Sequence, residues 1–379
     1  MIIKSLKYYE YKDKPEYWTI EEFSLNQINL LVGKNASGKT RTLNLISGLA
    51  KIITGDMKMR IISGYNEICF DKKGVLIKYI LDISSFKTKK EILIIDDKIL
   101  LDRKRSGKGS IYAKQLGRNI TFQAPEDVVA YITRRDNIQY PYLEDLFDWA
   151  NSVNHFLFGT QLGKDIAPIF SKKMEIPDKD IRDTNKVVEI FLKGIKLFNN
   201  PFKESIIDDM RNIGYKIEDI GIEKLRNVQM PHNLPGYPVG LYVKECDLKC
   251  KTYQTHISQG MFRALSLIIQ LNYSQLAGTN SCILIDDIGE GLDYERSTAL
   301  IKLIIDKANK SAIQIIMSTN DRFIMNAVPL EYWQVILRRG GRCKIINYKN
   351  SRDLFDEFKF TGLANFDFFS TEYYTSNNK

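Results

Sequence analysis

The chain has 379 residues, of which 44% are hydrophobic and 27% charged, with a formal net charge of +9. This composition predicts a globular protein with a packed core, and the lack of any run of about 18 apolar residues argues against a membrane span. The N-terminus has no signal-peptide layout, so a cytoplasmic protein is expected. The positive charge favours contact with polyanions, although a lysine-rich surface is more often simply solvated.

The five cysteines are odd in number and scattered along the chain, which predicts reduced thiols. Cys246 and Cys250, with His256 nearby, are the one group that resembles metal ligands. Their spacing is wider than that of a zinc knuckle and no second pair faces them, so a zinc site is not expected.

Residues 33–40 fit the phosphate-loop pattern GxxxxGK[ST]. They follow an apolar run, residues 28–32, that predicts a buried strand, and precede a helix on which Leu43, Ile46 and Leu49 recur at helical spacing. Such a loop turns backbone N–H groups toward phosphate oxygens at a helix N-terminus. The expected nucleotide-binding residues here are Gly33, Asn35, Ala36, Ser37, Gly38, Lys39, Thr40 and Arg41.

Two of these residues have individual roles in the pattern. The Lys39 ammonium is expected to reach the terminal phosphates, and the Thr40 hydroxyl is expected to ligate magnesium. The sequence therefore predicts a nucleoside triphosphate and Mg²⁺ as the ligands of residues 1–66, which form a nucleotide-binding N-terminal lobe.

Short alternating runs separated by charged turns fill residues 67–135 and predict a subdomain of antiparallel hairpins. One of its turns, residues 103–108, is basic and is a candidate for phosphate contact, although a solvated loop is the commoner outcome. Apolar residues three and four apart then predict a helical lobe over residues 136–235. Residues 236–379 form the last section of what we expect to be a single domain.

An apolar run at residues 282–285 leads into two carboxylates, Asp286 and Asp287. After a phosphate loop, this pattern predicts a buried parallel strand that ends beside the phosphates. Asp286 is the expected magnesium-organising residue, and Asp287 is expected to orient or deprotonate the attacking water. Glu290 is the alternative for this second role.

A serine and a glycine open a predicted helix at Ser258, Gln259 and Gly260, which gives a second place where an anion could meet a helix N-terminus. Here the sequence resembles the ATP-binding-cassette (ABC) ATPases, whose signature motif is followed by an apolar strand ending in acidic residues. Residues 291–293 match the D-loop of that family, and residues 315–321 resemble its switch strand.

The resemblance implies an α/β fold: an ABC-type P-loop ATPase head with a β-rich antiparallel subdomain and a helical-lobe insertion. Two departures bear on the chemistry. The catalytic glutamate of the family is Asp287 here, one methylene shorter, so slow turnover is expected. The switch histidine is Asn320, which can hydrogen-bond a γ-phosphate but carries no charge near neutral pH.

The Q-loop glutamine of the family is assigned to Gln139, with Gln123 as the alternative. The aromatic contact to adenine stays open, because Tyr8, Tyr9 and Tyr11 also fit ordinary strand packing.

The family implies that two copies sandwich two ATP molecules, with Ser258 of one copy at the nucleotide held by Lys39 of the other. ATP would then favour the closed dimer only before hydrolysis. A dimer or higher oligomer is therefore expected.

Among these ATPases the chain looks like the compact overcoming-lysogenisation-defect and related bacterial defence groups, and also like RecF-type ATPases. The stretch after Asp321 is too short for a nuclease domain. The expected function is a sensor or scaffold that controls a separately encoded effector, such as a toxic nuclease, in anti-phage defence. The alternative is a RecF-like repair ATPase that binds DNA.

The stretch after residue 354 is rich in phenylalanine and tyrosine, too rich for a disordered tail. The aromatic side chains are expected either to pack on the chain's own core or to form a docking surface for a partner. They are Phe355, Phe358, Phe360, Phe366, Phe368, Phe369, Tyr373 and Tyr374.

Overall fold

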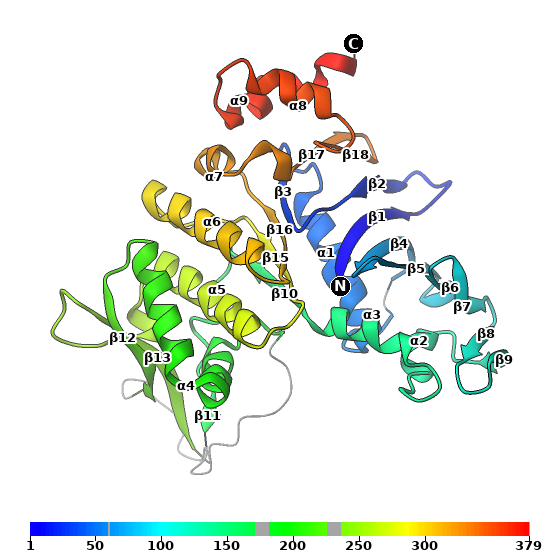
Figure 1. Ribbon diagram of the computed structural model, residues 1–379, viewed down its shortest axis with the longest axis horizontal. Helices are drawn as coiled ribbons and strands as arrows, with labels where there is room; N and C mark the ends of the chain where they lie inside the picture. The colour runs from blue at the N-terminus through cyan, green and yellow to red at the C-terminus, as the bar shows by residue number, and fades with distance from the viewer. Residues whose placement is uncertain (60, 171–181, 226–235, 379) are drawn as a thin grey trace. The chain divides into compact units, whose positions relative to one another are not determined.

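The structure is a computed structural model that describes residues 1–59, 61–170, 182–225 and 236–378 (Figure 1). The chain divides into two compact units. The first unit comprises Met1–Val153, Gln314–Ser318 and Pro329–Lys379, and the second comprises Asn154–Ile313 and Thr319–Val328. Among the described residues, no helix combines the length and the apolar character that a membrane crossing requires.

The first unit holds the strand before the phosphate loop. The relevant elements are β2 (Trp18–Ser24), β3 (Ile28–Val32), β16 (Gln314–Ser318), β17 (Trp333–Arg339) and β18 (Arg342–Asn347), in the order β16-β3-β17-β18-β2. Strand β3 lies parallel to both neighbours and all five of its residues are buried, as expected of a strand covered on both faces. Helix α1 (Lys39–Thr54) follows and buries Leu43, Ile46 and Leu49. The predicted strand and helix are both confirmed.

The rest of the first unit's sheet is a run of antiparallel hairpins. Its strands are β1 (Ile2–Glu10), β4 (Ser63–Lys72), β5 (Val75–Ser84), β6 (Lys87–Ile95), β7 (Lys98–Lys104), β8 (Lys108–Ala113) and β9 (Arg118–Gln123). From β4 to β9 each strand pairs with the next, so the predicted hairpins are confirmed. Side chains on one face pack against helices α2 (Ala130–Thr133) and α3 (Tyr142–Asn151), with the rings of Phe70 and Trp149 4.6 Å apart.

Arg103 is not part of an exposed basic turn, so neither outcome considered for residues 103–108, phosphate contact or a solvated loop, holds for this residue. Its side chain is fully buried and forms an ion pair with the equally buried Glu91, with 3.3 Å between Nη1 and the carboxylate. The strand alternation explains this, because Arg103 in β7 points to the same face as the buried Leu101. Lys104, Arg105 and Lys108 remain exposed.

The second unit contains the elements around the acidic pair and the signature. They are β10 (Val153–Leu157), β11 (Ile169–Phe170), α4 (Val187–Asn212), β12 (Ile217–Lys224), β13 (Tyr237–Glu245), β14 (Thr252–Tyr253), η1 (Gln254–His256), α5 (Gln259–Leu276), β15 (Cys282–Asp286), α6 (Tyr294–Asn309) and α7 (Arg322–Ala327). Strand β10 is the neighbour of β15, and the order β11-β13-β12 makes a small separate sheet. Helix α4 packs along α5 (Figure 1).

The predicted helical lobe is mixed rather than purely helical. Helices α3 and α4 lie in residues 136–235, but so do strands β10, β11 and β12. Strand β12 contains four charged residues and shows no clear strand pattern in the sequence. It forms a strand because it pairs with β13, a long-range contact that the local sequence does not reveal. The predicted boundary at residue 235 lies outside the described residues.

The aromatic C-terminal stretch belongs to the first unit and forms α8 (Arg352–Lys359), α9 (Asn365–Ser370) and η3 (Tyr373–Asn378). The Phe368 ring lies 4.6 Å from Phe355, 5.1 Å from Phe358 and 6.3 Å from Trp333, measured between centroids. These four side chains are buried, so the centre of the aromatic stretch packs on the chain's own core. Phe360 is the exception, with 91% of its surface exposed.

Candidate functional site

The phosphate loop connects β3 to α1 and leaves the N-terminus of α1 without a side-chain cap. Gly38 precedes the helix with φ of 114°, a conformation that only glycine adopts readily, and in the part of the chain that the structure describes no side chain caps this helix start. An uncapped N-terminus of a 16-residue helix favours an anion, because the free N–H groups and the helix dipole both attract negative charge.

Lys39 lies folded over this loop. Its Nζ donates to the carbonyl oxygen of Gly33 at 2.7 Å and to that of Lys34 at 3.4 Å, and only 7% of the residue is exposed. The ammonium is thus held at the mouth of the loop, where it can reach phosphate oxygens. Thr40, the expected magnesium ligand in the next position, is exposed in the first turn of α1.

The loop has the cradle that a phosphate requires. A Cβ at Gly33 would come within 2.4 Å of Ser37 Oγ and 3.1 Å of the Ile336 carbonyl oxygen, so glycine leaves room for the Ser37 side chain. Among the described residues, none forms a hydrogen bond with the buried Ser37 Oγ, which is unusual for a hydroxyl in a native protein. Arg338 Nη1 donates to the carbonyl of Ala36 at 2.7 Å, and Cys343 Sγ lies 3.4 Å from that of Ser37. These contacts fix the loop from β17 and β18, so the residues present fit a bound phosphate.

Arg41, Tyr8 and Tyr9 are each held by contacts with neighbouring side chains. The Arg41 guanidinium stacks on the Trp18 ring at 3.7 Å and forms an ion pair with Glu10. Tyr8 is buried, and its hydroxyl donates to Glu10 at 2.8 Å. Tyr9 stacks on Tyr65 with a centroid distance of 4.5 Å. The adenine contact therefore stays open.

Gln139 lies in the turn region before α3. Its side-chain Nε2 lies 3.5 Å from Gln115 Oε1, and its backbone carbonyl oxygen accepts from the backbone N–H of Lys114. Gln123 donates to the carbonyl of Ser106 at 3.0 Å. Both glutamines are held by the hairpin subdomain, and the assignment of Gln139 to nucleotide remains a prediction.

In the second unit, β15 ends at Asp286, which is 6% exposed, and its carbonyl accepts from the backbone N–H of Phe158 at 3.0 Å. Asp287 follows with φ of 54°, in the left-handed region. Its Oδ1 accepts a hydrogen bond from Asn320 Nδ2 at 3.3 Å. The structure therefore brings together two of the three residues expected to be catalytic.

Glu290, the third of these, is exposed and lies beside Gly159, where an added Cβ would be 3.1 Å from its Oε2. The loop between Asp287 and Glu290 is held from the switch strand, because Thr319 Oγ1 donates to the carbonyl of Ile288 at 3.1 Å. Asp287 has the closer contact with the switch residues, and Glu290 reaches the loop that follows β10.

The signature residues open α5 as expected. Ser258 caps the helix, its Oγ accepting from the N–H of Met261 at 3.3 Å, and its hydroxyl proton remains available to another acceptor. Gln259 donates to the carbonyl of Thr160 at 3.2 Å. Gly260 lies so near the loop of Gly291 that a Cβ would come within 2.3 Å of the Gly291 carbonyl.

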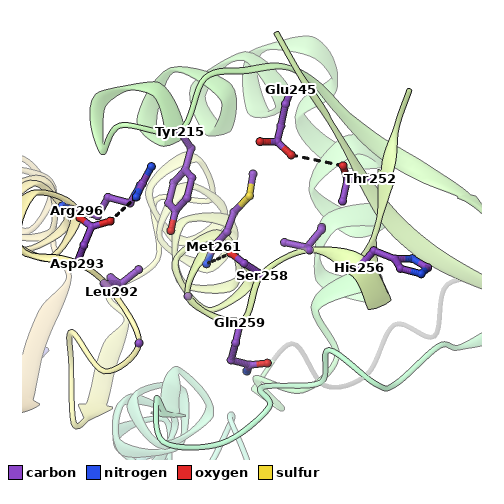
Figure 2. A pocket seen from close by; sticks show the side chains of 13 residues that line it. Tyr215, Glu245, Thr252, His256, Ser258, Gln259, Met261, Leu292, Asp293 and Arg296 are labelled. Carbon is purple, nitrogen blue, oxygen red and sulfur yellow. Dashed lines mark hydrogen bonds and ion pairs between the residues drawn. The ribbon is translucent and has the colours of Figure 1, made fainter. Parts of the chain in front are cut away.

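A cavity of ≈ 570 Å³ opens at this end of α5 (Figure 2). Tyr215, Met261 and Arg296 lie around it together with the signature residues. The Arg296 guanidinium stacks on Tyr215 at 4.5 Å and forms an ion pair with Asp293, the N-cap of α6. Burial raises the pKa of Tyr215 to about 12, so its hydroxyl stays protonated near neutral pH.

Neither a role for Arg263 nor strand β10 was predicted from the sequence. Arg263 lies on an almost wholly buried helix, and its position just after the signature was the one available signal. Strand β10 is only five residues long and stands directly after a helix, so no periodic pattern distinguishes it. Both contribute to the surroundings of Asp286 and Glu290.

The fold is similar to that of an SMC head bound to the C-winged helix domain of ScpA, with a TM-score of 0.54 and 12% identity. The match covers 93% of this chain and 100% of that chain. At such low identity the match shows the fold alone. It confirms the predicted fold class, a mixed α/β head with a large sheet.

Two further solved structures match at lower TM-scores. One is the SMC head domain from Thermotoga maritima, with a TM-score of 0.44, 14% identity and coverage of 92% of this chain and 99% of that chain. The other is an Smc head domain with an extended coiled coil bound to the C-terminal domain of ScpA, derived from Pyrococcus furiosus, with a TM-score of 0.49, 12% identity and coverage of 94% and 99%. No protein-family model and no curated protein matches the chain.

Proposed function

We propose that the protein binds ATP with Mg²⁺, hydrolyses it slowly and uses it as a dimerisation switch. The observation that carries this proposal is the phosphate loop: a helix N-terminus without a cap, a buried Ser37 hydroxyl without a partner, and Lys39 folded over the loop. All three features suit a bound phosphate chain. The likeness to an SMC head supports the proposal through the fold.

The proposed roles follow from the chemistry of each side chain. Lys39 neutralises charge on the terminal phosphates, and Thr40 and Asp286 supply the hydroxyl and carboxylate oxygens that Mg²⁺ prefers. A bound magnesium ion supplies electrostatic stabilisation of the phosphates. Asp287 orients the attacking water, and Asn320 holds the Asp287 carboxylate through the 3.3 Å hydrogen bond.

The dimer is part of the proposal because Ser258 and Gly260 lie at the start of α5, beside a cavity. The proposed ligand of this helix start is the nucleotide held by a second copy of the chain. Binding there stabilises the dimer only while the γ-phosphate is present, since hydrolysis removes the group that joins the two copies.

For the biological role, the proposal is that the dimer controls a separately encoded effector, such as a toxic nuclease, in anti-phage defence. Its support is the resemblance of the motifs to that group of ATPases. The SMC head in the first matching structure is likewise bound to a separate protein. The alternative is a RecF-like repair ATPase, which the net charge of +9 favours. Burial of Arg103 removes one cation from the surface that such a protein would use.

Native mass spectrometry of the protein expressed from its own genomic neighbourhood, with and without ATP, tests these roles. A neighbouring gene product in fixed stoichiometry supports effector control. A nucleotide-dependent dimer that carries only DNA supports the repair ATPase instead. The Lys39→Ala variant is the matched control, because it should lose nucleotide binding while the other surfaces stay intact.

A further inference from the structure

We propose that Arg263 is a positioning residue that couples the start of α5 to the acidic loop, defined as residues 287–293. This inference deepens the proposed function and rests on it. Arg263 would transmit the occupancy of the signature end of α5 to Asp287 and Glu290, the two candidates for orienting water.

Arg263 makes contact with two loops from one side chain. Its Nη1 donates to the carbonyl of Glu290 at 2.9 Å, and its Nε donates to the carbonyl of Thr160 at 3.1 Å. Gln259, one turn earlier on α5, donates to the same Thr160 carbonyl at 3.2 Å. The first turn of α5 is therefore tied both to the acidic loop and to the loop that follows β10.

Two glycines permit this close approach. A Cβ at Gly291, where φ is 80°, would lie 2.8 Å from Arg263 Nη1. A Cβ at Gly260 would lie 2.3 Å from the Gly291 carbonyl. The start of α5 and the acidic loop thus touch with no side chain between them, and a shift of one must move the other.

The environment of Arg263 is unusual for a cation. The residue is 8% exposed, and among the parts of the chain that the structure describes no carboxylate forms an ion pair with it. Burying a guanidinium on backbone carbonyls costs free energy unless those hydrogen bonds are well formed. A leucine or methionine of similar size would fill the space at lower cost, so the cation suits a role in holding these two carbonyls in place.

The acidic loop is held at its other end by the switch residues. Thr319 binds the carbonyl of Ile288, and Asn320 binds the side chain of Asp287. Arg263 binds the same loop two residues beyond Ile288. The loop that carries both acidic candidates is therefore fixed between the switch segment and the signature helix, and Arg263 supplies a side-chain hydrogen bond from the helix to it.

The test is a double-mutant cycle with Arg263→Lys and Gly291→Ala. Lysine keeps the charge but lacks the forked donors that reach two carbonyls, and the methyl group added by Gly291→Ala presses on the guanidinium from the loop side. We expect each change to lower the kcat for ATP hydrolysis by about tenfold or more, with the nucleotide Kd within about twofold of the parent. Because both act on one contact, the double variant should be no slower than the slower single variant.

Gly278→Ala is the matched control. Gly278 also lies in the second unit at a positive φ, 61°, but an added Cβ meets nothing within 4 Å. This variant carries the backbone strain without the contact and should keep the parent kcat. All rates are normalised to the folded fraction measured by thermal unfolding, so that loss of stability is not read as loss of coupling.

If the parent protein hydrolyses ATP and Arg263→Lys leaves its kcat unchanged, the inference about Arg263 is wrong, but the proposed function stands. A double variant whose kcat falls by the product of the two single effects overturns the inference in the same way. A parent that hydrolyses ATP no faster than Lys39→Ala overturns the proposed function and the inference with it.

Discussion

At the scale of single residues, the backbone at Asp287 gives a reason for the residue type. Its φ of 54° lies in the left-handed region, where aspartate is found more readily than a longer acidic side chain. The shorter carboxylate also remains close enough to accept from Asn320. The replacement of the family's glutamate thus agrees with the local geometry.

Substituting each acidic candidate separates their roles. We expect Asp287→Asn to lower the ATP hydrolysis rate by about a hundredfold, because asparagine keeps the size but loses the charge that orients water. ATP binding should be retained, since the phosphate loop is untouched. Glu290→Gln should keep most of the activity. Steady-state kinetics of both variants measures this, and the opposite ranking would move the water-orienting role to Glu290.

Loss of one partner of the buried Arg103–Glu91 ion pair should strongly lower the stability of the hairpin subdomain. Glu91 also accepts from the backbone N–H groups of Ala130 and Tyr131 at 2.6 and 3.0 Å. Arg103→Met would leave this carboxylate buried without its cation and should destabilise the protein by about 3–5 kcal/mol. Lys104→Met, on the exposed neighbour, should change stability by less than about 0.5 kcal/mol.

Chemical denaturation followed by tryptophan fluorescence checks this difference, since Trp149 lies in the same compact unit and contacts Phe70 of the hairpin sheet. Equal stability of the two variants would contradict a stabilising buried ion pair between Arg103 and Glu91.

At the scale of elements, the sequence predicted those whose signal is local. The strand before the phosphate loop and the strand that ends at Asp286 are continuous apolar runs with a distinctive end, and α1 shows its buried stripe. Strands β10 and β12 gave no such signal, because neither is a continuous apolar run: β10 contains asparagine and histidine, and β12 contains four charged residues. The aromatic stretch was recognised as ordered, but sequence alone cannot say which surface buries it.

The C-terminal elements offer a matched pair of phenylalanines. Phe368 is fully buried against Phe355 and Phe358, and Phe360 is 91% exposed. Phe368→Ala should destabilise the protein by about 3–5 kcal/mol through the loss of packed aromatic area. Phe360→Ala should leave stability nearly unchanged.

Thermal unfolding of the two variants measures this contrast. If both melt with the parent protein, the aromatic stretch is not part of the core. The docking alternative would then apply to all of it. If Phe360→Ala instead weakens binding of a partner without changing stability, the exposed ring is the part that serves docking.

At the scale of the whole molecule, the motifs divide between two units. The phosphate loop belongs to the first, and Asp286, Asp287, Asn320 and the signature belong to the second. Their order along the chain was enough to predict the class of fold. The contacts of Arg263 were not predictable, because they depend on two glycines far apart in sequence, Gly260 and Gly291, that allow backbone segments to meet.

If the proposed function is right, ATP joins two copies of this chain. Sedimentation velocity of Asp287→Asn, with and without ATP and Mg²⁺, measures this joining, since slow hydrolysis should preserve the closed state. We expect a monomer without nucleotide, a dimer with ATP and Mg²⁺, and a monomer in both conditions for Lys39→Ala. A mass that does not respond to ATP, whether monomer or dimer, would contradict it.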